Sequence, residues 1–159
     1  MSTKPPTDDP NNNDALSNQV DQSELLALLG YNVRRAYLVV QTHFDAQMEI
    51  FKLRQGDFAV LSTLRRNPRI TQKALAEALA IAPPNLATLL ERLESSGLLT
   101  RMRSTDDKRI QLVALTPQGA KLHTVALKAA RKADDAAIHR LSGNERVQLK
   151  QLLSKIFTT

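Results

Sequence analysis

Two adjacent prolines, Pro83 and Pro84, place the strongest constraint on how this chain can fold. Proline breaks a helix interior but is tolerated in a first turn, where its missing amide hydrogen would have no partner anyway. The helical pattern QKALAEALA therefore ends before the prolines, and NLATLLERLESS forms a new helix with its leucines on one face. Gly97 ends that helix, because glycine adopts the left-handed conformation at little cost. The pattern predicts two short helices joined by a tight connection.

A polar hairpin is predicted directly after these helices. Leu98–Met102 and Ile110–Leu115 have strand-like patterns, and residues 103–109 between them are charged or carry hydroxyl groups. Two short helices followed by a hairpin form a helix-turn-helix with a wing. The sequence therefore predicts a winged helix-turn-helix over residues 53–116.

Helical patterns also precede the two short helices. Asp21-Gln-Ser-Glu24 has the form of a capping box, and the apolar residues after it predict a long helix to about residue 48. A further helix is expected over residues 55–66, where Asn67-Pro68 ends it. Ile70-Thr71 is expected to be extended, with Thr71 capping the helix that follows it.

Two more helices are expected after the wing. Thr116-Pro117 begins an alanine-rich helix to about residue 140, and the capping box Ser142-Gly-Asn-Glu145 begins a last helix. The predicted order is α-α-β-α-α-β-β-α-α. The fold class is mainly α with a small β-hairpin, a winged helix-turn-helix plus long flanking helices.

Composition excludes several classes of protein. The chain has no cysteine, so disulfides, thiolate metal sites and thiol oxidation are excluded. No apolar run approaches the roughly 20 residues of a membrane span. The first 20 residues are rich in Pro, Asn and Asp, without the apolar segment of a signal peptide, and predict a disordered, acidic and polar tail. We expect a cytoplasmic protein with no membrane partner.

The charge distribution indicates a polyanionic partner. The net charge is +6, yet residues 1–24 carry one lysine against five carboxylates, whereas residues 65–109 carry nine Lys and Arg against five Asp and Glu. A basic central region favours nucleic acid, and a solvated basic surface is the simpler alternative.

Several polar residues of the winged unit are candidates for contacts with double-stranded DNA. Asn85, Thr88 and Arg92 share one stripe opposite the leucines, and Pro84 lies with Asn85 at the helix end that approaches bases. Basic residues of the hairpin can reach phosphates or the minor groove. These hairpin candidates are Arg101, Arg103, Lys108 and Arg109. Each residue, taken singly, could also be an ordinary surface residue.

An acid at the tip of the hairpin needs its own explanation, because phosphate repels it. We expect Asp107 to stabilise the wing by holding Arg109 through a charge-assisted hydrogen bond. The alternative is that the aspartates only favour the turn.

From Leu53 to Gly119 the chain resembles the multiple antibiotic resistance regulator (MarR) family of winged-helix transcription factors. The resemblance rests on QKALAEALAI, on PPNLATLLERLESSGLL and on the wing DKRIQLVALTPQG. The last segment matches the family's Asp-x-Arg and Leu-Thr-x-x-Gly pattern, although Thr105 stands where a proline is common. The resemblance implies a homodimer on a pseudo-palindromic operator, often a repressor, released by a small aromatic carboxylate or phenol.

The flanking helices fit such a dimer. Residues 21–50 and 117–159 are expected to form a helical dimerisation region, because both carry apolar residues that need partners. A cleft for an aromatic ligand could lie where this region meets the winged unit. The candidate lining residues are Tyr37, His43, Phe44, Met48 and Phe58, of which Phe44, Met48 and Phe58 are more simply core residues.

Other classes of function have less support. The three histidines lie far apart in the sequence, and neither a catalytic triad, a metal-binding group nor a glycine-rich phosphate loop is present. We therefore expect no enzyme, no metal and no cofactor. The remaining alternative is a winged-helix module that binds another protein and reads no DNA sequence. Such a module would expose apolar rather than polar and basic side chains.

Overall fold

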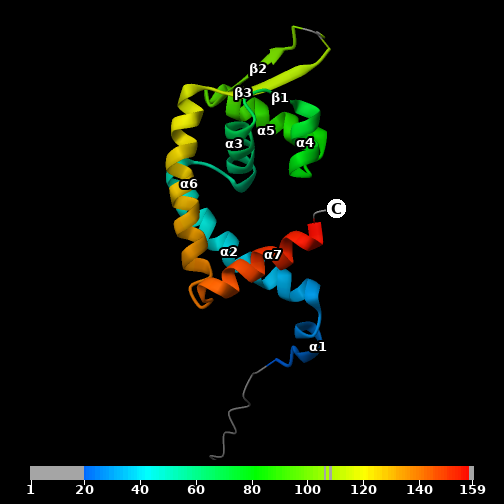
Figure 1. Ribbon diagram of the computed structural model, residues 1–159, viewed down its shortest axis with the longest axis vertical. Helices are drawn as coiled ribbons and strands as arrows, with labels where there is room; N and C mark the ends of the chain where they lie inside the picture. The colour runs from blue at the N-terminus through cyan, green and yellow to red at the C-terminus, as the bar shows by residue number, and fades with distance from the viewer. Residues whose placement is uncertain (1–19, 106, 108, 158–159) are drawn as a thin grey trace, which may run out of the picture. The chain divides into compact units, whose positions relative to one another are not determined.

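The computed structural model describes residues 20–105, 107 and 109–157, so most of the predicted tail lies outside the described residues. The chain divides into two units, residues 1–34 and 35–159, and each is described by itself. Figure 1 labels the elements. Within the described residues, no helix combines the length and apolar character that crossing a membrane requires.

The first unit corrects the prediction of one long helix. A short helix α1 spans Ser23–Leu26, and α2 begins separately at Leu29 and continues to Met48 in the second unit. The side chain of Asn32 donates to the carbonyl oxygens of Leu26 and Leu28, at 2.7 and 2.8 Å, which supplies partners for the carbonyls at the break. The predicted capping box is also replaced, because Asp21 accepts from the backbone of Ser23, at 2.9 Å.

The second unit contains the predicted helices before the wing. After α2, a 3-10 turn at Glu49–Phe51 and the left-handed residue Lys52 lead into α3, Gln55–Arg66. This turn was absent from the sequence prediction. Strand β1 is Ile70–Thr71, followed by α4, Gln72–Leu79, and α5, Pro83–Ser95.

Local capping explains where these elements begin and end. Thr71 accepts from the backbone N–H of Ala74, at 3.0 Å, as predicted. Ala80 takes the left-handed conformation and ends α4, and both prolines lie in the first turn of α5. Gly97, with φ of +70°, ends α5. The helix-turn-helix expected from the two prolines is therefore confirmed.

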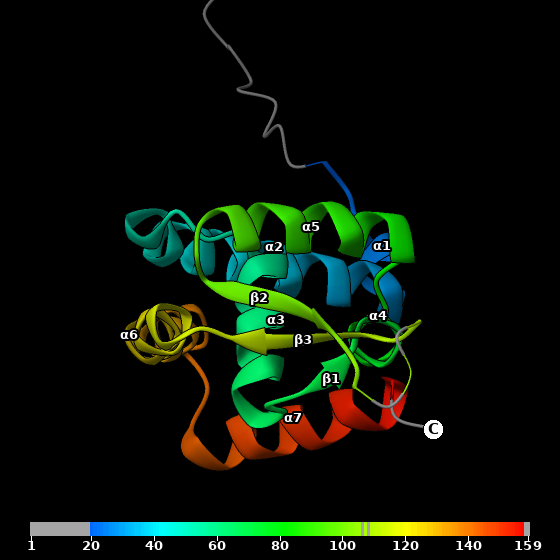
Figure 2. The same cartoon turned by 90° about the horizontal axis from the view of Figure 1, so that it is seen from above.

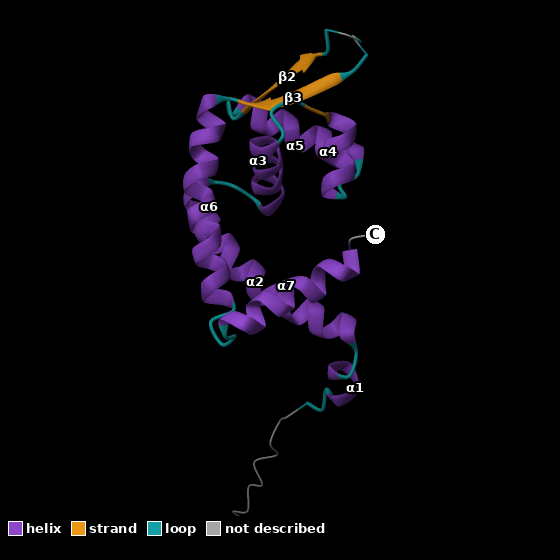
Figure 3. Ribbon diagram, viewed as in Figure 1, coloured by secondary structure: helices purple, strands orange, loops and turns teal. Residues whose placement is uncertain are grey.

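The wing is a three-stranded antiparallel sheet. Strands β2, Leu99–Arg103, and β3, Gln111–Leu115, pair with Leu99 opposite Leu115, and the sheet order is β1-β3-β2. Figure 2 shows β3 between its neighbours, with α5 alongside β2, and Figure 3 shows β2 and β3 in orange. Both hairpin strands begin one residue later than predicted. Leu98 still donates to the Leu93 carbonyl as part of the helix cap, and Ile110 donates to the Asp107 carbonyl within the turn.

A long helix and a terminal helix complete the chain. Helix α6 spans Pro117–Ala137 and packs beside α3, and α7 spans Gly143–Phe157. Ser142 and Glu145 form the predicted capping box, with Glu145 Oε2 accepting from the Ser142 backbone at 2.8 Å. Helix α6 ends earlier than the expected residue 140, because His139 folds back to the carbonyl of Ala136.

The core lies where α3, α4, α5 and the sheet meet. Its fully buried members include Leu61, Leu75, Leu86, Leu90 and Val113. Burial of each of the leucine and valine side chains stabilises the folded state by about 1.5–3 kcal/mol. This core fixes the inner face of α5, so the outer face of α5 is the polar stripe predicted from the sequence.

The start of α6 is held close to the end of α5. A Cβ atom at Gly119 would overlap the carbonyl oxygen of Leu98, so glycine is required there. Thr116 caps α6 by accepting from the N–H of Gly119, at 3.1 Å, and donates to the Gly97 carbonyl, at 2.6 Å. The Thr-x-x-Gly segment therefore joins the base of the wing to both helices.

Candidate nucleic-acid interface

The outer face of α5 presents polar side chains to solvent. Pro84, Asn85 and Thr88 are exposed, and Leu86 and Leu90 on the opposite face are fully buried. The hydroxyl of Thr88 donates to the Pro84 carbonyl, at 3.2 Å, which leaves its oxygen able to accept a hydrogen bond. The structure thus gathers these three candidates at the N-terminal end of one exposed helix face.

Arg92 lies on the same helix but is held by a buried acid. Its guanidinium makes a two-pronged ion pair with Asp57 of α3, with Nη1–Oδ2 at 2.7 Å and Nη2–Oδ1 at 2.5 Å. Asp57 is fully buried, whereas 41% of the Arg92 side chain remains exposed. Arg92, predicted as a DNA contact, therefore ties α5 to α3, and only its exposed part is open to an external partner.

The same carboxylate also begins α3. Asp57 Oδ2 accepts from the backbone N–H of Arg54, at 2.8 Å, which caps the helix from its third residue. Sequence reasoning missed Asp57. The available signal was an acid in the first turn of a predicted helix, but the distant partner Arg92 has no local signature.

A second ion pair joins α5 to the wing. Glu94 accepts from the backbone N–H of Arg101, at 2.9 Å, and from its Nε, at 2.8 Å. Hydrogen bonds from the Arg101 side chain and backbone hold the pKa of Glu94 below its usual value. Arg101, another predicted DNA contact, is thus used in fixing β2 against α5.

The wing tip contains the contact expected between Asp107 and Arg109. Asp107 accepts from the Arg109 backbone at 2.9 Å, from its Nε at 3.1 Å and from its Nη2 at 3.0 Å. These bonds from Arg109 lower the pKa of Asp107. The Arg109 side chain remains 91% exposed, and Arg103 is exposed on β2. Lys108 lies outside the described residues.

The five candidate ligand residues lie in different surroundings. Phe44 and Phe58 pack edge to face with ring centroids 5.4 Å apart, and Met48 is fully buried in the core. The hydroxyl of Tyr37 donates to Gln55, at 2.8 Å, and His43 is half-buried. Of the five, the structure brings Phe44 and Phe58 together as an aromatic pair.

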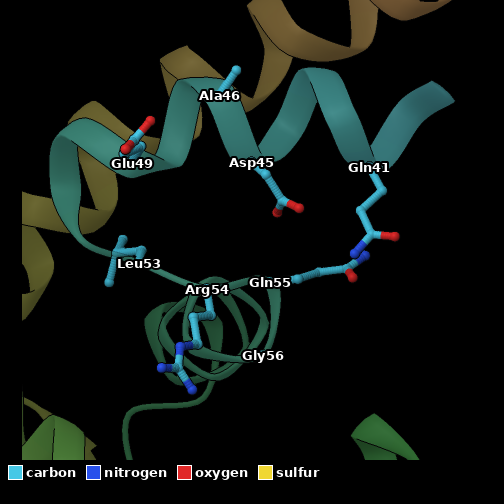
Figure 4. A pocket seen from close by; sticks show the side chains of 8 residues that line it. All are labelled: Gln41, Asp45, Ala46, Glu49, Leu53, Arg54, Gln55 and Gly56. Carbon is cyan, nitrogen blue, oxygen red and sulfur yellow. The ribbon is translucent and has the colours of Figure 1, made fainter. Parts of the chain in front are cut away.

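A separate hollow of about 580 Å³ lies between the end of α2 and the start of α3. Its lining includes Asp45, Glu49 and Arg54, and none of the five candidate residues. Figure 4 shows Gln41 and Asp45 pointing from α2 toward Gln55. In the described part of the chain, no three His, Asp or Glu side chains are grouped to bind a metal.

Comparison with known proteins assigns this arrangement to a family. The MarR family profile matches residues 53–111, which span most of the winged unit. The transcriptional regulator HosA of Escherichia coli O111:H- is 34% identical over 110 residues, which cover 69% of this chain and 82% of HosA.

Solved structures agree with this relationship. The transcriptional repressor CouR, bound to a 23-mer DNA duplex, superposes with a TM-score of 0.84 and 33% identity, over 88% of this chain and 99% of CouR. BpsR of Bordetella bronchiseptica, whose DNA binding is regulated by 6-hydroxynicotinic acid, gives a TM-score of 0.78 and 29% identity, over 83% and 94% of the two chains.

Replacing Asp57 and replacing Arg92 should lower the free energy of unfolding by different amounts. Arg92→Met leaves a buried carboxylate without its cation and should lower the free energy of unfolding by about 3–5 kcal/mol. Asp57→Asn leaves Arg92 with access to water and should cost about 1–2 kcal/mol. Urea unfolding of both variants and of the double variant measures the difference. Equal losses of stability in the two single variants would contradict this account.

Proposed function

Because this chain belongs to the MarR family of transcriptional regulators, we propose that it acts as a homodimeric repressor on a pseudo-palindromic operator, released by a small aromatic or phenolic anion. Like the relatives that it matches, the chain is a DNA-binding transcriptional regulator, and it is not an enzyme. Its expected location is the cytoplasm, together with its DNA.

The observation that carries the proposal is the exposed polar face at the start of α5 beside an exposed basic wing. Asn85 and Thr88 can donate to and accept from base edges in the major groove. Arg103 and Arg109, with Lys108, can neutralise phosphates and fix the register on the duplex. A module that only binds proteins would expose apolar side chains at this face, whereas its exposed side chains include the polar Asn85 and Thr88.

The homodimer is supported by apolar surface outside the winged unit. Helix α7 has no buried residue, and Leu152, Leu153 and Ile156 are 52%, 37% and 65% exposed. Leu25, Leu29 and other apolar residues at the start of the described chain are also exposed. Apolar surface of this extent marks an interaction site, and a second copy of the chain supplies the same apolar helices.

Two observations support the proposed class of effector ligand. The edge-to-face pair of Phe44 and Phe58 provides an aromatic surface, and BpsR is regulated by an aromatic acid. Tyr37 and His43 lie on α2, the helix that carries Phe44. We therefore propose an aromatic carboxylate or phenol as the ligand class, bound near this pair.

Assembly is tested by light scattering at micromolar concentration. The wild-type protein should have twice the protomer mass. Leu152→Asp introduces a charge into the apolar face of α7 and should shift the mass toward the monomer. Gln151→Asp adds the same charge on the side of α7 that faces away from Leu149 and Ile156, and it should leave the mass unchanged. A monomeric wild-type protein would refute the homodimer.

Base reading is tested at Asn85. Asn85→Ala should narrow the difference in binding free energy between operator and random DNA by about 1–3 kcal/mol for each base pair that Asn85 reads through paired hydrogen bonds. Ser95→Ala, at the other end of α5, is the matched control and should leave the preference unchanged. Titrations with both DNA species at one salt concentration measure this. An unchanged preference in Asn85→Ala would refute the assignment of α5 as the recognition helix.

The role of the wing acid is tested at Asp107. At neutral pH the carboxylate is ionised and its bonds to Arg109 are present, because the lowered pKa means they are lost only as the pH falls through that pKa. If these bonds orient Arg109 for DNA, Asp107→Asn should weaken operator binding although the protein becomes more positive. Asp134→Asn on α6 makes the same change in charge as a control. Tighter binding by Asp107→Asn would show that repulsion dominates.

A further inference from the structure

A second hollow, of about 670 Å³, opens between α3 and α6 and involves none of the candidate DNA contacts. Its cations come from both helices: Arg65 and Arg66 from the end of α3, and Lys128 and Arg131 from α6. All four are exposed residues. We call this group the α3–α6 basic hollow.

The four cations differ from other basic residues in how their charge is balanced. Arg92, Arg101, Arg109 and Arg146 each form an ion pair with a carboxylate. In the described ranges no carboxylate forms an ion pair with any cation of the basic hollow, and none lines it. Gathering like charges costs free energy, so the stability of the fold does not account for this cluster.

The lining of the hollow also includes polar side chains that are more deeply placed. His123 is only 6% exposed, and its Nε2 lies 3.2 Å from the hydroxyl of Ser62. The His123 ring stacks on Phe58 with centroids 6.0 Å apart, which fixes its orientation. Burial, and secondly the positive charge of Arg65, lower the pKa of His123. The positive charge of Arg65 therefore acts on the nearly buried His123.

We propose that the α3–α6 basic hollow binds small molecules that carry two or more phosphate groups. A phosphate monoester has a charge of about −1.5 to −2 near pH 7, so two such groups match the four cations. Arginine forks bind phosphate oxygens through paired hydrogen bonds. The volume lies in the range of small-molecule sites. A duplex backbone can reach exposed rim residues, but not the nearly buried His123, which favours a free ligand over DNA phosphate.

Inorganic tripolyphosphate is the probe for this site. Its addition to the full-length protein should raise the melting temperature, because a ligand that binds the native state stabilises it. In proton NMR titrations the pKa of His123 should rise, because a bound polyanion offsets the charge of Arg65. The signal of the exposed His139 should stay in place and serves as the internal reference.

Two variants with the same loss of charge separate a site from general attraction. Lys128→Gln should weaken tripolyphosphate binding about tenfold, the typical effect of losing one hydrogen bond to a charged group. Lys155→Gln, on α7 and outside the hollow, should leave binding unchanged. Equal weakening in the two variants, or an unchanged His123 titration, would overturn the proposal.

The same variants distinguish a free ligand from DNA phosphate. If the hollow binds a free ligand, tripolyphosphate should bind the protein–operator complex with the His123 shift intact, and Lys128→Gln should leave the salt dependence of operator binding unchanged. If the hollow holds DNA backbone, that variant should reduce the salt slope by about one per protomer. This second result would refute the proposal and leave the DNA-binding function of α5 and the wing unaffected.

Discussion

The buried carboxylate of Asp57 is the constraint on which the geometry of this winged helix depends. Its Oδ2 caps the first turn of α3, and its two oxygens accept hydrogen bonds from Nη1 and Nη2 of Arg92 on α5. An ionised carboxylate is tolerated in a protein interior only with such partners, so neither helix can move without exposing or orphaning a charge. A nonpolar contact could slide, because apolar packing is not directional. The ion pair instead specifies one orientation of α5 on α3.

The wing depends on α5 in a similar way. Glu94, two residues after Arg92, holds both the backbone and the side chain of Arg101 on β2. The Thr116 hydroxyl and the close approach at Gly119 fix the other strand's connection to α6. Orientation therefore passes from α3 to α5 and from α5 to the hairpin through directional contacts. A preorganised surface loses less conformational entropy on binding than a mobile one.

Sequence predicted the elements whose causes are local. Pro83 and Pro84, Gly97 and the caps at Thr71, Thr116 and Ser142 each act within a few residues, and each was found where expected. The break at Ala27-Leu28 was missed because apolar spacing continues through it. The partner of Arg92 was missed because Asp57 is 35 residues away in sequence. Only the folded chain brings such pairs together. The sequence therefore could not distinguish Asn85 and Thr88, which are exposed, from Arg92, which is bonded to another helix.

The basic residues differ in whether a carboxylate of the same chain forms an ion pair with them, and this difference indicates their roles better than their positions in the sequence do. Arg92 and Arg101 are used internally, each by an acid on another element, so much of their hydrogen-bonding capacity is already satisfied. Among the residues that the structure describes, no acid forms an ion pair with Arg65 or Lys128, so their charges are open to counterions from outside. Arg109 is intermediate, since Asp107 engages its Nε and Nη2 while the side chain stays exposed. The bonds to Asp107 leave its Nη1 edge for an external acceptor. Asp107 thus limits the conformations of Arg109 and leaves part of its guanidinium able to bind phosphate. This role explains why a negative charge is present on a surface that approaches DNA.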